Sequence, residues 1–579
     1  MIAKKRNSVS GLALKIVVAW ALIAFVVYPV ISLLFQTFWY DGSLSTEVFG
    51  KVFSSARAVQ SLKNSFILAF TLVVTVNIVG TLCVLFTEYW DIKGAKLLRL
   101  SYMTSLIYSG VVLVAGYKYV YGDSGLLTKL LLQINPNMNP DWFVGYGAVV
   151  FVMTFSCTQN HMMFLKNAIH GLDYHTIEAA KNMGASGGTI FFKIVLPALK
   201  PTFFAITILT FLTGLGAMSA PLIVGGENFQ TINPMIITFS QSTYSREVAA
   251  FLAIILGLAT IILLSIFSQI EKKGNYVSVS KTKAKLTKQK IHNPIMNVVA
   301  HIVAWFMFII YMLPIVLIVI YSFCDYNTIM TGEITASSFT LENYQKLFTS
   351  IEVVKPYLVS ISYSLGAAII AALISSICVR FVQKSKNKLN KLYEYGALIP
   401  WLLPSTLIAL GLTMAYGDRN PLIFNKVLVG TTIILLIGYI VIKLPFSYRM
   451  IRSAFFAVDD DLEDAAKCMG ASTFYTMRKV IIPVILPAVM SVAILNFNGL
   501  LADYDLTAFL YHPLFEPLGI VIKAASDENA SIDAKCMSFV YTIVLMILSS
   551  ITLYFGQGNG MLRFRRWKQK RLEKKVYKK

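Results

Sequence analysis

Two stretches of the chain are near copies of each other: residues 178–186 read Glu-Ala-Ala-Lys-Asn-Met-Gly-Ala-Ser, and residues 464–472 read Asp-Ala-Ala-Lys-Cys-Met-Gly-Ala-Ser. Seven of the nine positions are identical, and the exchange of Glu178 for Asp464 keeps the negative charge. The copies lie 286 residues apart (464 minus 178), and the match continues at this offset to Pro197 and Pro483 without a gap. An internal repeat of this kind indicates a chain built from two related halves.

Each copy predicts a short helix followed by a sharp turn. Glu-Ala-Ala-Lys is a good helix-forming sequence. The glycines that follow it, Gly184 and Gly470, allow the chain to change direction directly after the helix. A short amphipathic helix of this kind can present one face to a partner. The presence of two copies at one fixed offset argues against a generic loop helix.

The sequence around the two copies predicts a membrane protein. Of the 579 residues, 56% are hydrophobic and 14% are charged, whereas ordinary globular chains have roughly 25% charged residues. A bilayer core requires roughly 20 apolar residues per helix. Runs of about this length lie near residues 12–38, 64–86, 100–121, 145–166, 201–225 and 248–270, and near 296–322, 357–380, 393–416, 421–445, 484–510 and 537–556. The predicted fold class is therefore all-α, a polytopic membrane protein with about twelve helices in two six-helix halves.

Basic residues set the expected orientation. The net charge of +22 is concentrated in short segments between the apolar runs, near residues 4–6, 93–99, 272–290, 380–391 and 563–579. With twelve spans all of these segments fall on one side, which the positive-inside rule identifies as cytoplasmic. Both termini and both repeated loops are then cytoplasmic. This distribution indicates membrane topology and argues against nucleic-acid binding.

The repeat divides the chain into four predicted regions. The first half spans residues 1–270, and its repeated loop spans 178–197. A basic cytoplasmic linker spans 271–295, the second half spans 296–560 with its loop at 464–483, and a basic cytoplasmic tail spans 561–579. The apolar stretch near the N-terminus is too long for the hydrophobic region of a signal peptide, so we interpret it as the first membrane helix.

The third spans of the two halves differ in proline content. Pro400 and Pro404 are expected to break the helix in the second half, whereas residues 107–114 of the first half contain no proline. The two halves are therefore expected to gate differently.

The repeated pattern, E-A-A-x-x-x-G followed at a fixed distance by I-x-L-P, resembles the EAA loop of binding-protein-dependent ABC importer permeases. The first copy matches fully, and the second matches with substitutions, at Glu178, Ala179, Ala180, Gly184, Ile194, Leu196 and Pro197, and at Asp464, Ala465, Ala466, Gly470, Val480, Ile482 and Pro483. In that family the loop is a coupling helix that docks in a cleft of the ATP-hydrolysing subunit. The resemblance, which covers nearly the whole chain, implies this role here. Asp464 departs most from the pattern, which would make the two docking contacts unequal.

The chain has no G-x-x-x-x-G-K-[ST] loop for cradling phosphates. We therefore expect a permease subunit that is not itself an enzyme and needs no cofactor, while a partner uses ATP. The resemblance implies two copies of an ABC ATP-binding subunit, an extracytoplasmic solute-binding protein and a place in the bacterial cytoplasmic (inner) membrane. Transport would proceed as the two repeated halves rock between outward-facing and inward-facing states.

The fused two-half organisation resembles the ferric-iron permease branch, and thiamine and 2-aminoethylphosphonate importers have related permeases. Asp503, Tyr504 and Asp505 occupy the positions that correspond to the uncharged residues 217–219 of the first half. Charged groups at membrane depth usually face a cavity, and carboxylate and phenolate oxygens suit Fe(III). These three residues are therefore candidates for a substrate path, with solvation of a helix end at the outer interface as the alternative. Asn496 and Asn498 either line the same path or hydrogen-bond between helices.

Ferric iron is the leading substrate, and thiamine and 2-aminoethylphosphonate remain alternatives. In another class, an ion-gradient-driven secondary transporter would require coupling-ion residues deep in several spans. Few such residues are found, and that class leaves the duplicated loop unexplained. The six cysteines and six histidines show no metal-ligand spacing.

Overall fold

A computed structural model describes residues 2–40, 43–106, 110–273, 287–331, 334–383, 390–527 and 529–556. The described chain is almost entirely helical, which confirms the all-α prediction. Its sheet structure consists of two short antiparallel strands, β1 (Trp39–Tyr40) and β2 (Ser43–Leu44). Most of the predicted linker and the whole predicted tail lie outside the described residues.

Ten helical segments of the described residues are long and apolar enough to cross a membrane. They are Leu12–Phe38, Ala56–Tyr89, Tyr146–His170, Gly187–Leu215, Arg246–Ile266, Pro294–Ser322, Ile351–Gln383, Thr432–Phe456, Phe474–Asn498 and Ile532–Phe555. An eleventh candidate is the pair Lys391–Leu402 and Ser405–Tyr416, which is bent by 111°. The prediction of a polytopic membrane protein is confirmed, with most spans near their expected positions.

The fourth span of the second half was predicted at the wrong place. Residues 421–445 were expected to be helical, but α22 runs from Thr432 to Phe456. Asn420 instead caps a single 3-10 turn, and Phe424 and Asn425 have positive φ angles of 58° and 55°. These left-handed residues, which a helix does not accommodate, keep the chain in a loop up to Thr431.

The third span of each half is divided into two helices, and the expectation that the two halves gate differently stays a prediction. The bend of 111° falls at Leu403 and Pro404, as the prolines predicted. In the first half, however, α5 (Ala95–Tyr102) and α6 (Val111–Tyr121) are separate helices, and residues 107–109 lie outside the described chain. Gly110 precedes α6 with a φ angle of 61°, so a glycine rather than a proline accompanies this interruption.

The chain forms two compact units, which do not follow the predicted halves. Unit 1 comprises Met1–Val48, Leu347–Val521 and Val544–Lys579, and unit 2 comprises Phe49–Lys346 and Ile522–Ile543. The first span therefore belongs with helices of the second half, and the first span of the second half belongs with helices of the first. The predicted division into two repeated halves therefore stays a prediction from the sequence.

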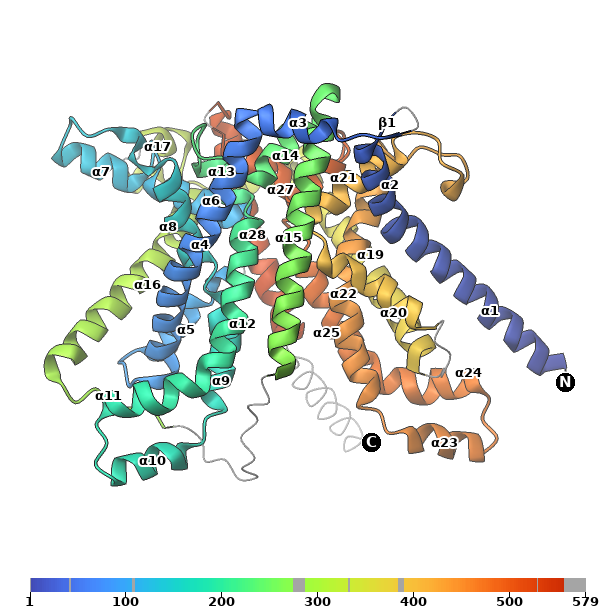
Figure 1. Cartoon of the computed structure of the whole chain (residues 1–579). Helices are drawn as coiled ribbons and strands as arrows, with labels where there is room; N and C mark the ends of the chain where they lie inside the picture. Colours follow the sequence, from blue (N-terminus) through green and yellow to red (C-terminus); the bar gives the residue numbers. More distant parts are fainter. Residues whose placement is uncertain are drawn as a thin grey trace, which may run out of the picture. The chain divides into compact units, whose positions relative to one another are not determined.

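In unit 1, the first span and α19 (Ile351–Gln383) show how the helices are held together. Trp20 of α1 (Ile2–Leu22) donates its indole N–H to the Leu422 carbonyl at 3.0 Å, and Tyr416 of α21 (Ser405–Tyr416) donates its hydroxyl to the Ala24 carbonyl. A run of buried alanines on α19, at 367, 368, 371 and 372, allows α22 and α25 (Ile482–Asn498) to approach closely. Helices α23 (Asp460–Cys468) and α24 (Thr473–Thr476) lie at one end of α22 (Figure 1).

In unit 2, α4 (Ala56–Val84) packs along α12 (Leu196–Leu215). Gly214 permits this contact, because a Cβ there would lie 2.7 Å from the Ala69 Cα. Helix α16 (Pro294–Ser322) joins the unit through Tyr102, whose hydroxyl donates to the Ala304 carbonyl at 2.7 Å. Helices α10 (Tyr174–Asn182) and α11 (Gly187–Ile190) lie together where α12 begins (Figure 1).

Candidate functional site

The two repeated loops have the same helix caps. Asp173 and Asp459 precede α10 and α23, and each carboxylate accepts from the backbone N–H two residues later, at 3.1 Å in both loops. Ser186 and Ser472 precede α11 and α24, and each hydroxyl accepts from the N–H three residues later, at 3.2 Å and 3.3 Å. Such side-chain acceptors satisfy N–H groups that a helix leaves unpaired at its start. The sequence repeat is therefore also a structural repeat.

The turn after each short helix depends on a glycine. Gly184 and Gly470 have φ angles of 82° and 79°. In both loops the glycine N–H donates to the carbonyl three residues earlier at 2.9 Å, and the next N–H donates to the carbonyl five residues earlier at 3.0 Å. This pair of hydrogen bonds, with a left-handed residue between, is the Schellman helix ending. The turn predicted from the glycines is thus present at both positions.

The acidic residue and the first alanine of each motif are exposed, whereas the second alanine packs inward. Glu178 and Ala179 are exposed and Ala180 is 4% exposed; in the other loop Asp464 and Ala465 are exposed and Ala466 is 3% exposed. The exposed face of each short helix therefore carries one acidic side chain and one small side chain. Both lie at positions that the family resemblance assigns to coupling.

A methionine directly before each glycine was not singled out from the sequence. Met183 and Met469 are both 82% exposed. They occupy equivalent positions of the repeat and are identical, which was the signal available in the sequence. Exposed apolar side chains at matched positions suit contact with a partner.

Different ionic contacts lie near the two loops. In unit 2, the carboxylate of Glu88, at the end of the second span, accepts from Arg99 Nη2 at 2.8 Å and lies 2.8 Å from His170 Nε2. In unit 1, Arg380 Nη2 of α19 lies 3.1 Å and 3.0 Å from the two carboxylate oxygens of Glu463 on α23. The position equivalent to Glu463 is the buried, apolar Ile177. The second short helix is thus itself held by an ion pair.

Replacement of Arg380 by alanine is expected to release α23 from α19. Glu463 is 7% exposed and also lies 3.7 Å from Lys467 Nζ; loss of the Arg380 partner of this buried charge is expected to cost about 3 kcal/mol. Limited proteolysis of the purified protein should then cut faster between residues 456 and 470. The double variant Arg380→Met/Glu463→Leu should restore resistance because it leaves no unpaired charge. Unchanged cleavage of Arg380→Ala would show that packing alone holds the helix.

The end of the linker contacts the first short helix. Gln289 pairs its backbone with the segment around Trp90, donating to the Tyr89 carbonyl at 2.8 Å and accepting from the Asp91 N–H at 3.0 Å. Its side-chain oxygen accepts from Lys181 Nζ of α10 at 2.5 Å. In the other loop the equivalent Lys467 lies 2.8 Å from Asp464 and 3.7 Å from Glu463. The linker thus supports α10 through Lys181.

The candidate path residues have several structural roles. Asp503 Oδ2 accepts from the N–H groups of Leu506 and Thr507 at 3.3 Å and 3.2 Å and from the Thr507 hydroxyl at 3.0 Å, so it caps α26 (Thr507–Leu510). Asn496 donates to the Ser447 hydroxyl at 2.7 Å, and Asn498 accepts from the Thr552 hydroxyl at 2.9 Å. Both asparagines therefore make the hydrogen bonds between helices that the sequence left as an alternative.

The acidic segment lies after the end of a span, since the helix Phe474–Asn498 ends before it. Asp503, Tyr504 and Asp505 are all half-buried. Burial raises the pKa of the Asp505 carboxyl to about 7, and the neighbouring Asp503 acts in the same direction. Among the described residues, no group of three or more His, Cys, Asp or Glu side chains is placed to hold a metal ion. A role of these residues in passing a cation therefore stays a prediction.

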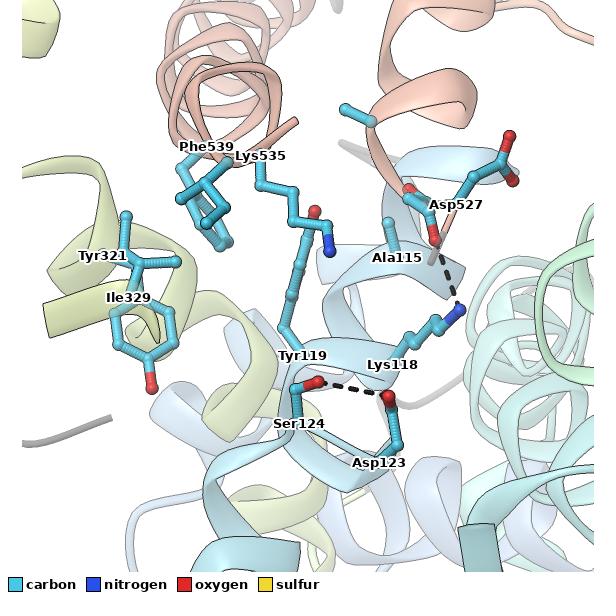
Figure 2. A pocket seen from close by; sticks show the side chains of 13 residues that line it. Ala115, Lys118, Tyr119, Asp123, Ser124, Tyr321, Ile329, Asp527, Lys535 and Phe539 are labelled. Atoms are coloured by element: carbon cyan, nitrogen blue, oxygen red, sulfur yellow. Dashed lines mark hydrogen bonds between the residues drawn. The ribbon is translucent and has the colours of Figure 1, made fainter. Parts of the chain in front are cut away.

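A cavity of about 150 Å³ lies in unit 2 between α6 and the segment around α27 (Leu518–Ala525) and the start of α28 (Ile532–Gly556). Lys118, Asp123, Asp527 and Lys535 all contribute to its lining (Figure 2). Lys118 donates to the Ser526 carbonyl at 3.2 Å. Two lysines and two aspartates balance the charge of this lining, so it favours neither an anion nor a cation.

Apolar spanning helices that carry two exposed loops, with the same caps and the same glycine turn, define a multi-span membrane protein with an internal repeat. The chain belongs to the family described as "Binding-protein-dependent transport system inner membrane component", whose model matches residues 3–273 and 364–558. The two matched segments confirm the resemblance to a fused, two-half permease of an ABC importer. The protein is thus a membrane component of such a system.

Three relatives illustrate the similarity. A "Probable ABC transporter permease protein y4fN" from Sinorhizobium fredii is 35% identical over 94% of this chain and 95% of the relative. The "Ferric transport system permease protein FbpB" from Actinobacillus pleuropneumoniae is 21% identical over 84% of this chain and 69% of the relative. The "Putative 2-aminoethylphosphonate transport system permease protein PhnV" from Salmonella choleraesuis is 24% identical over 46% of this chain and 99% of the relative.

Proposed function

We propose that this permease imports ferric iron delivered by an extracytoplasmic solute-binding protein. The observation that carries the proposal is similarity to a ferric permease along 84% of the chain, which includes both repeated loops. The similarity to the phosphonate permease, in contrast, covers only 46% of this chain. The carboxylates of Asp503 and Asp505 add hard oxygen atoms of the kind that Fe(III) prefers.

Two copies of an ABC ATP-binding subunit would supply the energy, one at α10 and one at α23. The caps, the left-handed glycines and the exposed methionines give the two loops equivalent surfaces for one type of subunit. ATP-driven closure of the two subunits would move both short helices and, through them, the spans that they precede. In this proposal the loops and both termini face the cytoplasm of a bacterium, and ATP is used by the partner.

A second candidate substrate is 2-aminoethylphosphonate. One observation favours it: Lys443 places an ammonium group within the span α22, beside the loop that contains Asp503. A phosphonate group would be attracted to this charge. For thiamine, which carries a positive charge, the structure offers no comparable observation.

Replacement of Asp505 by asparagine tests the ferric proposal at a residue to which the structure gives no hydrogen bond. If the carboxylate lines the path, the loss of its charge should reduce uptake of labelled Fe(III) about tenfold, since a charge-assisted contact contributes about 1.5 kcal/mol or more. Asp505→Glu is the matched control and should retain uptake. Unchanged uptake by Asp505→Asn, at equal membrane levels, would assign Asp505 to the outer interface.

The substrate is tested in cells that contain the ATP-binding subunit and the binding protein, with and without this chain. Labelled Fe(III), thiamine and 2-aminoethylphosphonate are supplied separately. Loss of iron uptake alone upon deletion supports the ferric assignment. Intact iron uptake with loss of another solute would overturn that assignment while keeping the permease function.

A further inference from the structure

One face of α22 presents three polar side chains to the segment that runs from α25 to α26. Tyr439, Lys443 and Ser447 are spaced four residues apart, so they lie along one side of the helix. The Tyr439 hydroxyl lies 2.6 Å from the Thr507 hydroxyl, and the Ser447 hydroxyl accepts from Asn496 at 2.7 Å. We call this contact, formed within unit 1, the polar seam.

Lys443 is the charged member of the polar seam. Its Nζ donates to the Gly499 carbonyl at 3.4 Å, a long hydrogen bond. Gly499 leaves room for the ammonium group, because a Cβ at that position would lie 3.0 Å from Nζ. An ammonium group has three N–H donors, so this contact leaves two of them available.

The acidic neighbour does not form a close ion pair with this lysine. Asp503 is near enough to interact electrostatically with Lys443, but its Oδ2 is engaged by three donors at the start of α26. Within the described residues, Lys443 has no carboxylate at ion-pair distance. Charged side chains within membrane spans are costly, usually paired, and typical of substrate or ion pathways.

The first half has no such charge. At the offset of 286 residues, Cys157 corresponds to Lys443, and His161 and Thr210 correspond to Ser447 and Asn496. The equivalent packing in unit 2 therefore needs no cation, since a cysteine fills the place. The fold alone does not explain a lysine at position 443.

We propose that Lys443 contacts a negatively charged oxygen of the substrate, so that an oxyanion passes this permease, either alone or as the carrier of a metal ion. The proposal rests on the proposed importer function and adds the chemical class of what is moved. A half-buried ammonium with free donors, next to a carbonyl and a distant carboxylate, suits carboxylate, phosphate or phosphonate oxygens. For ferric iron, it means that the ion travels with an oxyanionic ligand.

The test uses the full complex of this chain, its ATP-binding subunit and its binding protein in proteoliposomes. ATP-dependent uptake is measured against concentration for labelled ferric citrate, 2-aminoethylphosphonate and thiamine. The variants are Lys443→Gln, which removes the charge, and Lys443→Arg, which keeps it. Lys51→Gln is the control, since Lys51 forms a 2.6 Å ion pair with Glu247. Uptake is normalised to the amount of assembled complex, so that a folding defect is not counted as a transport defect.

We expect Lys443→Gln to lose uptake of the oxyanionic substrate at least about tenfold, mainly through a raised KM, with Lys443→Arg within about threefold of the wild type. Lys51→Gln should behave like the wild type. Uptake of 2-aminoethylphosphonate without ferric citrate, with the same loss in Lys443→Gln, would support the inference while overturning the ferric assignment. Equal uptake by Lys443→Gln and wild type, or uptake of thiamine alone, would overturn the inference.

Discussion

Replacement of Gly184 and Gly470 together by valine is expected to abolish substrate uptake while leaving membrane insertion intact. Both glycines have left-handed backbones, with φ angles of 82° and 79°. The left-handed conformation costs an ordinary L-residue about 1–2 kcal/mol, and a β-branched side chain fits it least well. A Cβ at either position would meet no atom within 4 Å. The defect would therefore come from the backbone, by misdirecting the chain after each short helix.

The matched control replaces both glycines by asparagine, which tolerates the left-handed conformation better than other residues with a side chain. Uptake into proteoliposomes, at equal amounts of inserted protein, should be lost with valine and largely kept with asparagine. Wild-type uptake by the valine variant would contradict a coupling role for the loops. Equal loss with asparagine would show that the space around the glycines matters rather than their backbone.

Replacement of Met183 and Met469 together by aspartate is expected to prevent binding of the ATP-binding subunit. Each methionine is 82% exposed and lies at the tip of its loop, directly before the glycine turn. If the partner covers these side chains, each substitution buries a carboxylate without a counter-charge, at a cost of several kcal/mol. A loss of about 3 kcal/mol would weaken binding more than a hundredfold.

Co-purification of the ATP-binding subunit with the membrane-inserted permease measures this effect. Leucine at both positions keeps an apolar side chain of similar volume and should retain the subunit. The single aspartate variants show whether both loops contribute. Full retention of the subunit by the double aspartate variant would exclude the methionines from the docking surface.

The local structure of the repeated loops could be predicted from the sequence with good accuracy. The helix-forming Glu-Ala-Ala-Lys and the glycine three residues later fixed the short helix and its ending, because both are local effects. The span that begins at Thr432 was predicted too early in the chain. Its start is set by the turn conformations of Phe424 and Asn425, and a hydrophobicity profile carries no information about backbone conformation. The exchange of first spans between the compact units depends on contacts hundreds of residues apart, such as that of Tyr416 with Ala24, which no local pattern reveals.

The substrate path was harder to predict than the coupling loops. The sequence drew attention to Asp503 and Asp505 because they are acidic, whereas the structure gives Asp503 a role as a helix cap. Lys443 was overlooked because the predicted span ended at residue 445, which placed the lysine near the end of that span rather than within it. Its significance depends on neighbours in the segment between α25 and α26, Gly499 and Asp503. Met183 and Met469 could have been found, since they are identical in both copies of the repeat.

The coupling of both repeated loops to import is tested by ATP-dependent uptake into proteoliposomes that contain this chain and its ATP-binding subunit, with binding protein and labelled Fe(III) supplied outside. We expect accumulation that requires ATP and the binding protein and that disappears when valine replaces Gly184 and Gly470. Accumulation driven by an ion gradient without ATP, or accumulation that survives both glycine substitutions, would contradict this coupling.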